Sequence, residues 1–206
     1  MRGIYCRSFH DFLYHFMNQD RDIIHDAFRR HNQAAKALIE GSTENILMVA
    51  EMFCRAVRGG SAVFTCGNGG SAADAQHFAG ELLCRYKGDR RPLPAVALTA
   101  DSSTLTAISN DYEYREVFAR QLEALGHAGD VLIAFTTSGR SPNVLRALEV
   151  ARIKQMNTIA LTGSMGRHLE GAADIVVIVP SEETARIQEI HELIYHAWCE
   201  YLDAQL

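Results

Sequence analysis

The residues from position 62 to position 77 read AVFTCGNGGSAADAQH, and this stretch decides the fold class. Ala62–Thr65 is an apolar run too short to be a helix, which predicts a buried strand. The three glycines that follow let the backbone turn sharply and approach a ligand closely, and Ser71 can cap a helix that begins there. On this loop alone, a ligand-binding turn and an ordinary strand-to-helix turn are equally good interpretations.

Four more short apolar runs lie further along the chain and alternate with helix-forming stretches. The runs are Ala95–Thr99, Val131–Thr136, Thr158–Leu161 and Ile175–Val179, and the helical stretches are Ala72–Tyr86, Tyr114–Leu125, Asn143–Gln155 and Glu183–Leu202. Near-continuous apolar strands separated by helices are typical of parallel sheets that are covered on both faces. We therefore predict an α/β fold, a three-layer, doubly wound, five-stranded parallel sheet.

Two helices are expected before the sheet. The segment from about residue 8 to residue 40 is helix-prone, contains no proline and ends at Gly41, and a second helical pattern begins two residues later. We assign residues 1–20 to an N-terminal extension, expected to be helical, and residues 21–206 to a single domain that includes these helices.

The composition fits one domain with one substantial core, since 48% of the 206 residues are hydrophobic. The net charge of −5 gives no broad basic field, which argues against nucleic acid as a partner. Five cysteines without CxxC spacing argue against a disulfide framework or a thiolate zinc cluster. The sequence shows neither a membrane-length apolar span nor a signal-peptide pattern, so we expect a cytoplasmic protein with no membrane partner.

Residues 136–142, Thr-Thr-Ser-Gly-Arg-Ser-Pro, follow the third predicted strand and begin another helix. Four hydroxyls surround one glycine, and Pro142 stands at the first helical position, so amides, hydroxyls and the helix dipole converge on one anion. A hydroxyl-rich cap without a ligand is the alternative, but a cap needs only one hydroxyl. Two such loops at one edge of a sheet predict a pocket for a polar, phosphorylated metabolite.

Candidate acid, base and metal-binding residues lie on two of the predicted helices. His77 and Glu81 are four residues apart, so they share a face of the helix that begins at the first loop. Gln188 and His196 lie on the last helix, roughly 12 Å apart along its axis, and this spacing alone is a weak indication of a metal site. We interpret His191 as a core-facing or solvated histidine.

Four ordered segments resemble sugar isomerase (SIS) domains of the phosphoheptose isomerase type. They are Gly67–Glu81, Leu105–Asp111, the Thr-Ser-Gly-x-Ser loop at residues 137–141, and Thr184–Glu189, and the resemblance covers roughly residues 20 to 205. It implies an aldose-ketose isomerase that interconverts sedoheptulose 7-phosphate and D-glycero-D-manno-heptose 7-phosphate through an enediol, for bacterial lipopolysaccharide. It also implies a homotetramer with active sites between subunits and one Zn²⁺ per subunit.

The resemblance implies a role for each matching residue. Glu81 and His196 would be the catalytic pair, because a carboxylate base and an imidazole acid suit proton transfer between C1 and C2. The implied zinc ligands are His77, Glu81, Gln188 and His196. The implied substrate-binding residues are Asn68, Gly69, Gly70, Ser71, Asn110, Asp111, Thr136, Thr137, Ser138, Ser141 and Gln188. Zinc could polarise the carbonyl, and whether Glu81 acts mainly as base or as ligand stays open.

Two segments depart from the family pattern. Thr136 and Arg140 change the usual phosphate-loop sequence, and residues 164–168 lack the usual acidic, glycine-rich turn. One alternative is therefore an isomerase or sensor of another phosphosugar. The other is a non-catalytic relative that binds a replication initiator protein, but that relative lacks residues equivalent to Glu81 and His196, and both are present here.

Overall fold

The computed structural model describes the backbone of residues 9–206 and the side chains of residues 21–206. Residues 1–8 of the expected helical extension lie outside the described range. Within that range, no helix is both long and apolar enough to cross a membrane.

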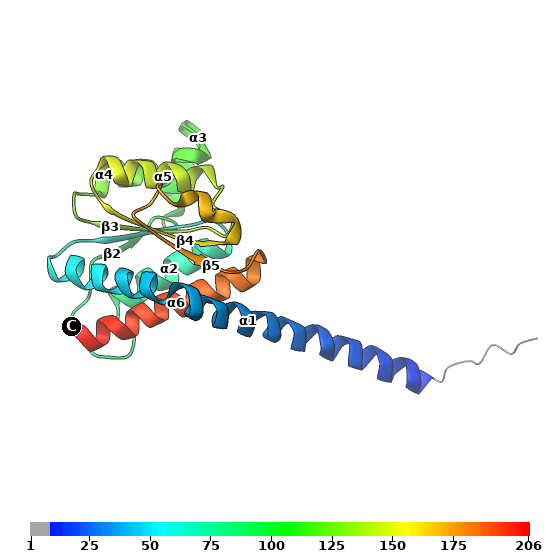
Figure 1. The fold of residues 1–206 in the computed structure, drawn as a ribbon. Coiled ribbons are helices and arrows are strands. Elements are labelled where there is room, and N and C mark those ends of the chain that lie inside the picture. The colour runs from blue at the N-terminus through cyan, green and yellow to red at the C-terminus, as the bar shows by residue number, and fades with distance from the viewer. Residues whose placement is uncertain (1–8) are drawn as a thin grey trace, which may run out of the picture.

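Five parallel strands form one sheet in the order β2-β1-β3-β4-β5, as the sequence predicted (Figure 1). The strands are β1 (Val63–Cys66), β2 (Ala95–Ala97), β3 (Val131–Phe135), β4 (Asn157–Gly163) and β5 (Ile175–Val179). β1 pairs with both β2 and β3, so the chain winds outward in opposite directions on the two sides of β1. This switch point places the loops after β1 and β3 next to each other, at the edge where open α/β sheets bind their ligands.

Helices cover both faces of the sheet and complete the three layers (Figure 1). One face carries α2 (Gly70–Leu83), α6 (Thr184–Gln205) and the C-terminal part of α1 (Phe9–Arg58). Their apolar residues pack into one core around Phe53, Phe78 and Trp198. The other face carries α4 (Ala119–Leu125) and α5 (Pro142–Ile153) over a second core. The inner strands β1, β3 and β4 are therefore buried on both faces, which explains their near-continuous apolar runs, whereas Val96 of the edge strand β2 is exposed.

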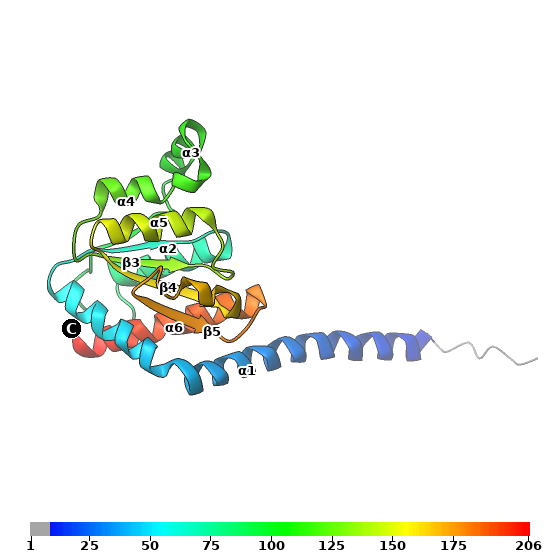
Figure 2. The same cartoon turned by 45° about the horizontal axis from the view of Figure 1, so that its top comes forward.

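The prediction of two N-terminal helices was wrong, because α1 is one continuous helix of 50 residues that passes through Gly41. A mid-helix glycine costs only about 1 kcal/mol. The hydroxyl of Thr43, which follows the expected break, donates to the carbonyl of Ile39 one turn back, a bond compatible with the helix interior. Val49 and Phe53 are fully buried in the C-terminal part, whereas the N-terminal part projects away from the domain (Figure 2).

Helix α3 (Ser102–Asp111) was not predicted, because none of its side chains is fully buried and its apolar stripe is short, with Leu105 and Ile108 packed against the second core. Asp101 starts it by accepting hydrogen bonds from the amides of Ser103 and Thr104. The predicted helix Tyr114–Leu125 is divided into a short 3₁₀ turn, η1 (Tyr114–Glu116), and α4. A second 3₁₀ segment, η2 (Ser164–Leu169), connects β4 to β5.

Candidate active site

The loops after β1 and β3 are joined by a reciprocal pair of amide hydrogen bonds. Asn68 Nδ2 donates to Asn143 Oδ1 at 2.9 Å, and Asn143 Nδ2 donates back to Asn68 Oδ1 at 2.8 Å. The hydroxyl of Tyr114 also donates to Asn68 Oδ1, at 3.0 Å. The structure therefore brings the two predicted ligand loops together at one sheet edge.

Glycines in the β1 loop allow a close approach between the loop, α2 and α6. Gly69 has a φ of +58°, and a Cβ on Gly67 would lie 2.5 Å from the carbonyl oxygen of Ser71. A Cβ on Gly70 would meet the side-chain amide of Gln188 at 2.6 Å, so α6 brings this predicted ligand directly to the loop. The expectation that Ser71 caps the helix was wrong. Gly69 is the N-cap, and Ser71 lies buried in the first turn of α2.

The β3 loop has the shape of an anion site. Gly139 has a φ of +70°, and its amide donates to Thr136 Oγ1 at 3.1 Å, so the buried Thr136 hydroxyl is used inside the loop. Ser141 is the N-cap of α5 but makes no capping hydrogen bond with its side chain. Three predicted phosphate ligands remain partly exposed at the start of a helix, namely Thr137, Ser138 and Ser141.

His168 lies in the connection between β4 and β5, in the turn that departs from the family pattern, and its side chain contacts this loop. Its Nε2 lies 3.0 Å from the carbonyl oxygen of Gly139, and its Nδ1 lies 3.1 Å from that of Met165. A Cβ on Gly139 would lie 2.9 Å from Gly166 Cα and 3.0 Å from His168 Cε1. The sequence indicated only that this turn was unusual, and its contact with the β3 loop was not foreseen.

Three of the predicted catalytic and metal-binding side chains form one cluster, with His77 and Glu81 on α2 and His196 on α6. One donor atom from each lies within 4.8 Å of the other two, and His77 Nε2 is 3.1 Å from Glu81 Oε1. Two imidazoles and a carboxylate are donors that zinc accepts, so the cluster fits that metal. The fourth predicted ligand, Gln188, has its amide against Gly70, nearer the β1 loop.

Three side chains that the sequence did not reveal surround His77. The hydroxyl of Tyr195 lies 2.9 Å from His77 Nδ1, and Glu192 Oε1 lies 3.5 Å from the same nitrogen. Burial, reinforced by Glu192, raises the pKa of Asp74 to about 7, while His77 acts in the opposite direction. Within residues 21–206, the buried Oδ2 of Asp74 has no hydrogen-bond partner. In the sequence, only the positions of these residues along the two helices, close to His77 and His196, could have indicated them.

Asn110 and Asp111, predicted to line the sugar site, are exposed at the end of α3. Asn110 Nδ2 donates to Asp111 Oδ1 at 2.8 Å. Tyr114, three residues further on, connects this segment to Asn68. His191, by contrast, is completely buried against Phe135, which confirms a core-facing histidine.

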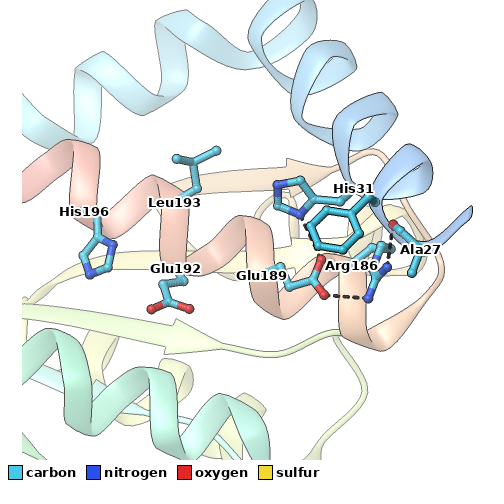
Figure 3. A pocket seen from close by; sticks show the side chains of 8 residues that line it. Ala27, His31, Arg186, Glu189, Glu192, Leu193 and His196 are labelled. Carbon is cyan, nitrogen blue, oxygen red and sulfur yellow. Dashed lines mark hydrogen bonds and ion pairs between the residues drawn. The ribbon is translucent and has the colours of Figure 1, made fainter. Parts of the chain in front are cut away.

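A cavity of about 520 Å³ opens beside the cluster of His77, Glu81 and His196, between α1 and α6. Figure 3 shows His196 and Glu192 at one end and an ionic group at the other. In that group His31 Nδ1 lies 2.9 Å from Glu189 Oε2, and Arg186 donates to the carbonyl of Ala27. The residues that line the cavity are Ala27, Phe28, His31, Arg186, Glu189, Glu192, Leu193 and His196.

The sequence and the fold have counterparts among known proteins. The SIS domain family matches residues 28–163, and the chain belongs to this family. It is 49% identical to the phosphoheptose isomerase of Shewanella loihica and 47% identical to that of Shewanella frigidimarina. Each match spans 186 residues, 89% of this chain and 94% of the relative. The protein is therefore an isomerase of phosphosugars.

Solved structures agree with this assignment. The phosphoheptose isomerase from Neisseria gonorrhoeae is 42% identical with a TM-score of 0.83, and that from Francisella tularensis is 40% identical with a TM-score of 0.86. In both cases the match covers 90% of this chain and 98% of the other. The Vibrio vulnificus NanR protein, at 14% identity and a TM-score of 0.63, shares the fold alone.

Proposed function

We propose that the enzyme interconverts sedoheptulose 7-phosphate and D-glycero-D-manno-heptose 7-phosphate and thereby supplies heptose for bacterial lipopolysaccharide. The observation that carries the proposal is the cluster of His77, Glu81 and His196, within 4.8 Å of one another, on two helices that meet at the β1 loop. The proteins to which it is 40–49% identical bear the name phosphoheptose isomerase.

The β3 loop would hold the phosphate. The hydroxyls of Thr137, Ser138 and Ser141 offer hydrogen bonds, and the free amides at the start of α5 favour a negative charge. Thr136 would contribute through the loop shape that its bond to Gly139 maintains. The remaining predicted ligands would line the sugar, namely Asn68, Gly69, Gly70, Ser71, Asn110, Asp111 and Gln188.

Glu81 and His196 would carry the proton transfers. In the ketose-to-aldose direction, Glu81 removes a proton from C1 while His196 donates one to the oxygen on C2, which gives the enediol. Glu81 then returns its proton to C2, and His196 takes the proton from the oxygen on C1. The carbonyl has moved from C2 to C1, and both side chains are restored to their starting protonation states.

We propose one zinc ion per subunit, held by His77, Glu81, Gln188 and His196. The clustered imidazole and carboxylate donors support this proposal. When bound, zinc would polarise the substrate carbonyl and stabilise negative charge on the enediolate. A Glu81 oxygen that ligates the metal is less free to accept a proton. Activity measured with and without a chelator therefore shows whether Glu81 acts mainly as a metal ligand or as the base.

We also propose a homotetramer with active sites between subunits. Glu81 lies eleven residues after Gly70, roughly 16 Å along the axis of α2. A substrate whose phosphate sits in the β3 loop must therefore extend far along α2, or must use a neighbouring subunit's groups. Helix α1 carries exposed apolar side chains suited to a subunit contact, among them Ile23, Ile24, Phe28 and Ile39.

The proposed compartment is the cytoplasm, and we treat residues 21–206 as one domain. Among residues 21–206, all four cysteines are free thiols, in keeping with a reducing environment. The four are Cys54, Cys66, Cys84 and Cys199.

The test is to incubate the purified enzyme with sedoheptulose 7-phosphate in D₂O and to follow the product by NMR. We expect an aldose 7-phosphate with deuterium at C2, no turnover by Glu81→Gln, and loss of turnover with a chelator that zinc reverses. No turnover of sedoheptulose 7-phosphate, together with isomerisation of a different ketose phosphate, would assign another substrate. Capture of a replication initiator protein without any turnover would favour a scaffold.

A further inference from the structure

Tyr195 is the neighbour of His196 in sequence, but it serves the other histidine of the cluster. Its side chain is almost fully buried, and its hydroxyl lies 2.9 Å from Nδ1 of His77. Its ring packs against Phe78 and edge-on against Phe135, with centroids 5.4 and 6.0 Å away. The position of the hydroxyl is therefore fixed by the core.

The two nitrogens of the His77 ring face different partners. Nδ1 faces Tyr195 and Glu192, and Nε2 faces Glu81 at 3.1 Å. The rings of His77 and His196 lie edge-to-face with centroids 5.0 Å apart. A bond at Nδ1 therefore decides where Nε2 points, and it points into the cluster.

We propose that Tyr195, assisted by Glu192, is a positioning residue that holds the His77 ring with Nε2 directed at Glu81 and His196. The metal-binding part of this inference rests on the proposed function. Metal-ligating histidines usually donate their second N–H to an oxygen, and loss of that partner typically lowers metal affinity about 10- to 100-fold.

A phenol suits this task because it both donates and accepts hydrogen bonds. Without metal, Nε2–H donates to the Glu81 carboxylate, and the Tyr195 hydroxyl donates to the bare Nδ1. A histidine that ligates a metal through Nε2 needs the lone pair of that nitrogen, so its proton must be on Nδ1. The Nδ1–H group then donates a hydrogen bond to the Tyr195 oxygen or to the Glu192 carboxylate. Tyr195 thus serves both tautomers of His77, which phenylalanine cannot do.

The experiment compares Tyr195→Phe with Tyr201→Phe, a control on the same helix whose ring packs against the same core. Zinc affinity is measured by competition with a chromophoric chelator. The ring ¹⁵N shifts of His77 are recorded in the metal-free protein at about pH 8. We expect Tyr195→Phe to bind zinc about 10- to 100-fold more weakly and its His77 shifts to move toward a tautomer mixture, whereas Tyr201→Phe changes zinc affinity less than about twofold.

Two outcomes separate this inference from the proposed function. If wild type binds zinc, and Tyr195→Phe shows the same affinity and the same His77 shifts, the positioning role is wrong although the metal site stands. If wild type binds no zinc, the proposed metal is wrong, and the His77 shifts alone decide the role of Tyr195. A tautomer change in Tyr195→Phe then supports it, and unchanged shifts overturn it.

Discussion

Asn68 and Asn143 exchange two hydrogen bonds, at 2.9 and 2.8 Å, across the point where the sheet reverses its winding. One residue follows β1 and the other lies in the first turn of α5, so the pair joins loops that are 75 residues apart in sequence. The β1 loop and the β3 loop therefore hold a fixed relative position, which the proposed substrate requires if it contacts both of them.

Replacing Asn143 by alanine should uncouple the loops. Asn143 is buried, so the substitution leaves Asn68 without its main partner and should cost about 1–3 kcal/mol of unfolding free energy. We expect KM for the sugar phosphate to rise more than kcat falls. Asn157→Ala is the control, because its amide bonds backbone carbonyls away from the site, at Gly129 and Asp130. A KM that is unchanged in Asn143→Ala, or raised equally in both variants, would contradict the coupling.

Substitutions of the proposed acid and base should remove activity without unfolding the protein. Glu81→Gln and His196→Ala should each lower kcat by about 100-fold or more, because each removes a group that transfers a proton. Both side chains are only partly buried, so circular dichroism should match wild type. Retention of more than about a tenth of the wild-type kcat in either folded variant would exclude that residue from the chemistry.

Two glycine substitutions should have opposite effects on stability. In Gly139→Ala the new Cβ meets the Gly166 backbone at 2.9 Å and the φ of +70° is unfavourable, so we expect a loss of at least about 1 kcal/mol and weaker phosphate binding. Gly41→Ala meets nothing within 4 Å in a helix and should stabilise by about 0.5–1 kcal/mol. Urea denaturation measures both. A destabilised Gly41→Ala would argue against the continuous α1 helix.

Acid should destabilise the protein partly through His191. Burial lowers its pKa from 6.5 to about 3. Between about pH 3 and pH 6.5, His191 is therefore protonated in the unfolded chain but neutral in the folded one. Stability from this residue is complete above pH 6.5 and falls by about 1.4 kcal/mol per pH unit below it. The raised pKa of Asp74 gives the opposite slope between about pH 4 and pH 7, so the difference between wild type and His191→Leu is the measurement. Parallel stability curves for the two proteins would contradict this account.

The sequence predicted the strands well because each is an apolar run, and the inner strands, such as Val131–Phe135, are buried on both faces. The predicted helix end at Gly41 was wrong, because the cost of a glycine within a helix is smaller than the stabilisation from the packing of the C-terminal part of α1. The prediction also missed α3, whose start depends on the Asp101 cap rather than on an apolar face.

For the site, spacing placed His77 and Glu81 on one face of a helix, but it could not show that His196 joins them. That proximity depends on how α6 packs against α2, which no local pattern encodes. Tyr195 and His168 were missed for the same reason. Each acts through a contact with a residue far away in sequence, His77 for the first and Gly139 for the second.

The most direct test of the central claim is a crystal structure of Glu81→Gln with sedoheptulose 7-phosphate bound. We expect the phosphate to accept hydrogen bonds from Thr137, Ser138 and Ser141, with C1 and C2 next to residue 81 and His196 of the same or a neighbouring subunit. A phosphate bound away from the β3 loop, or reacting carbons distant from both side chains, would contradict the account.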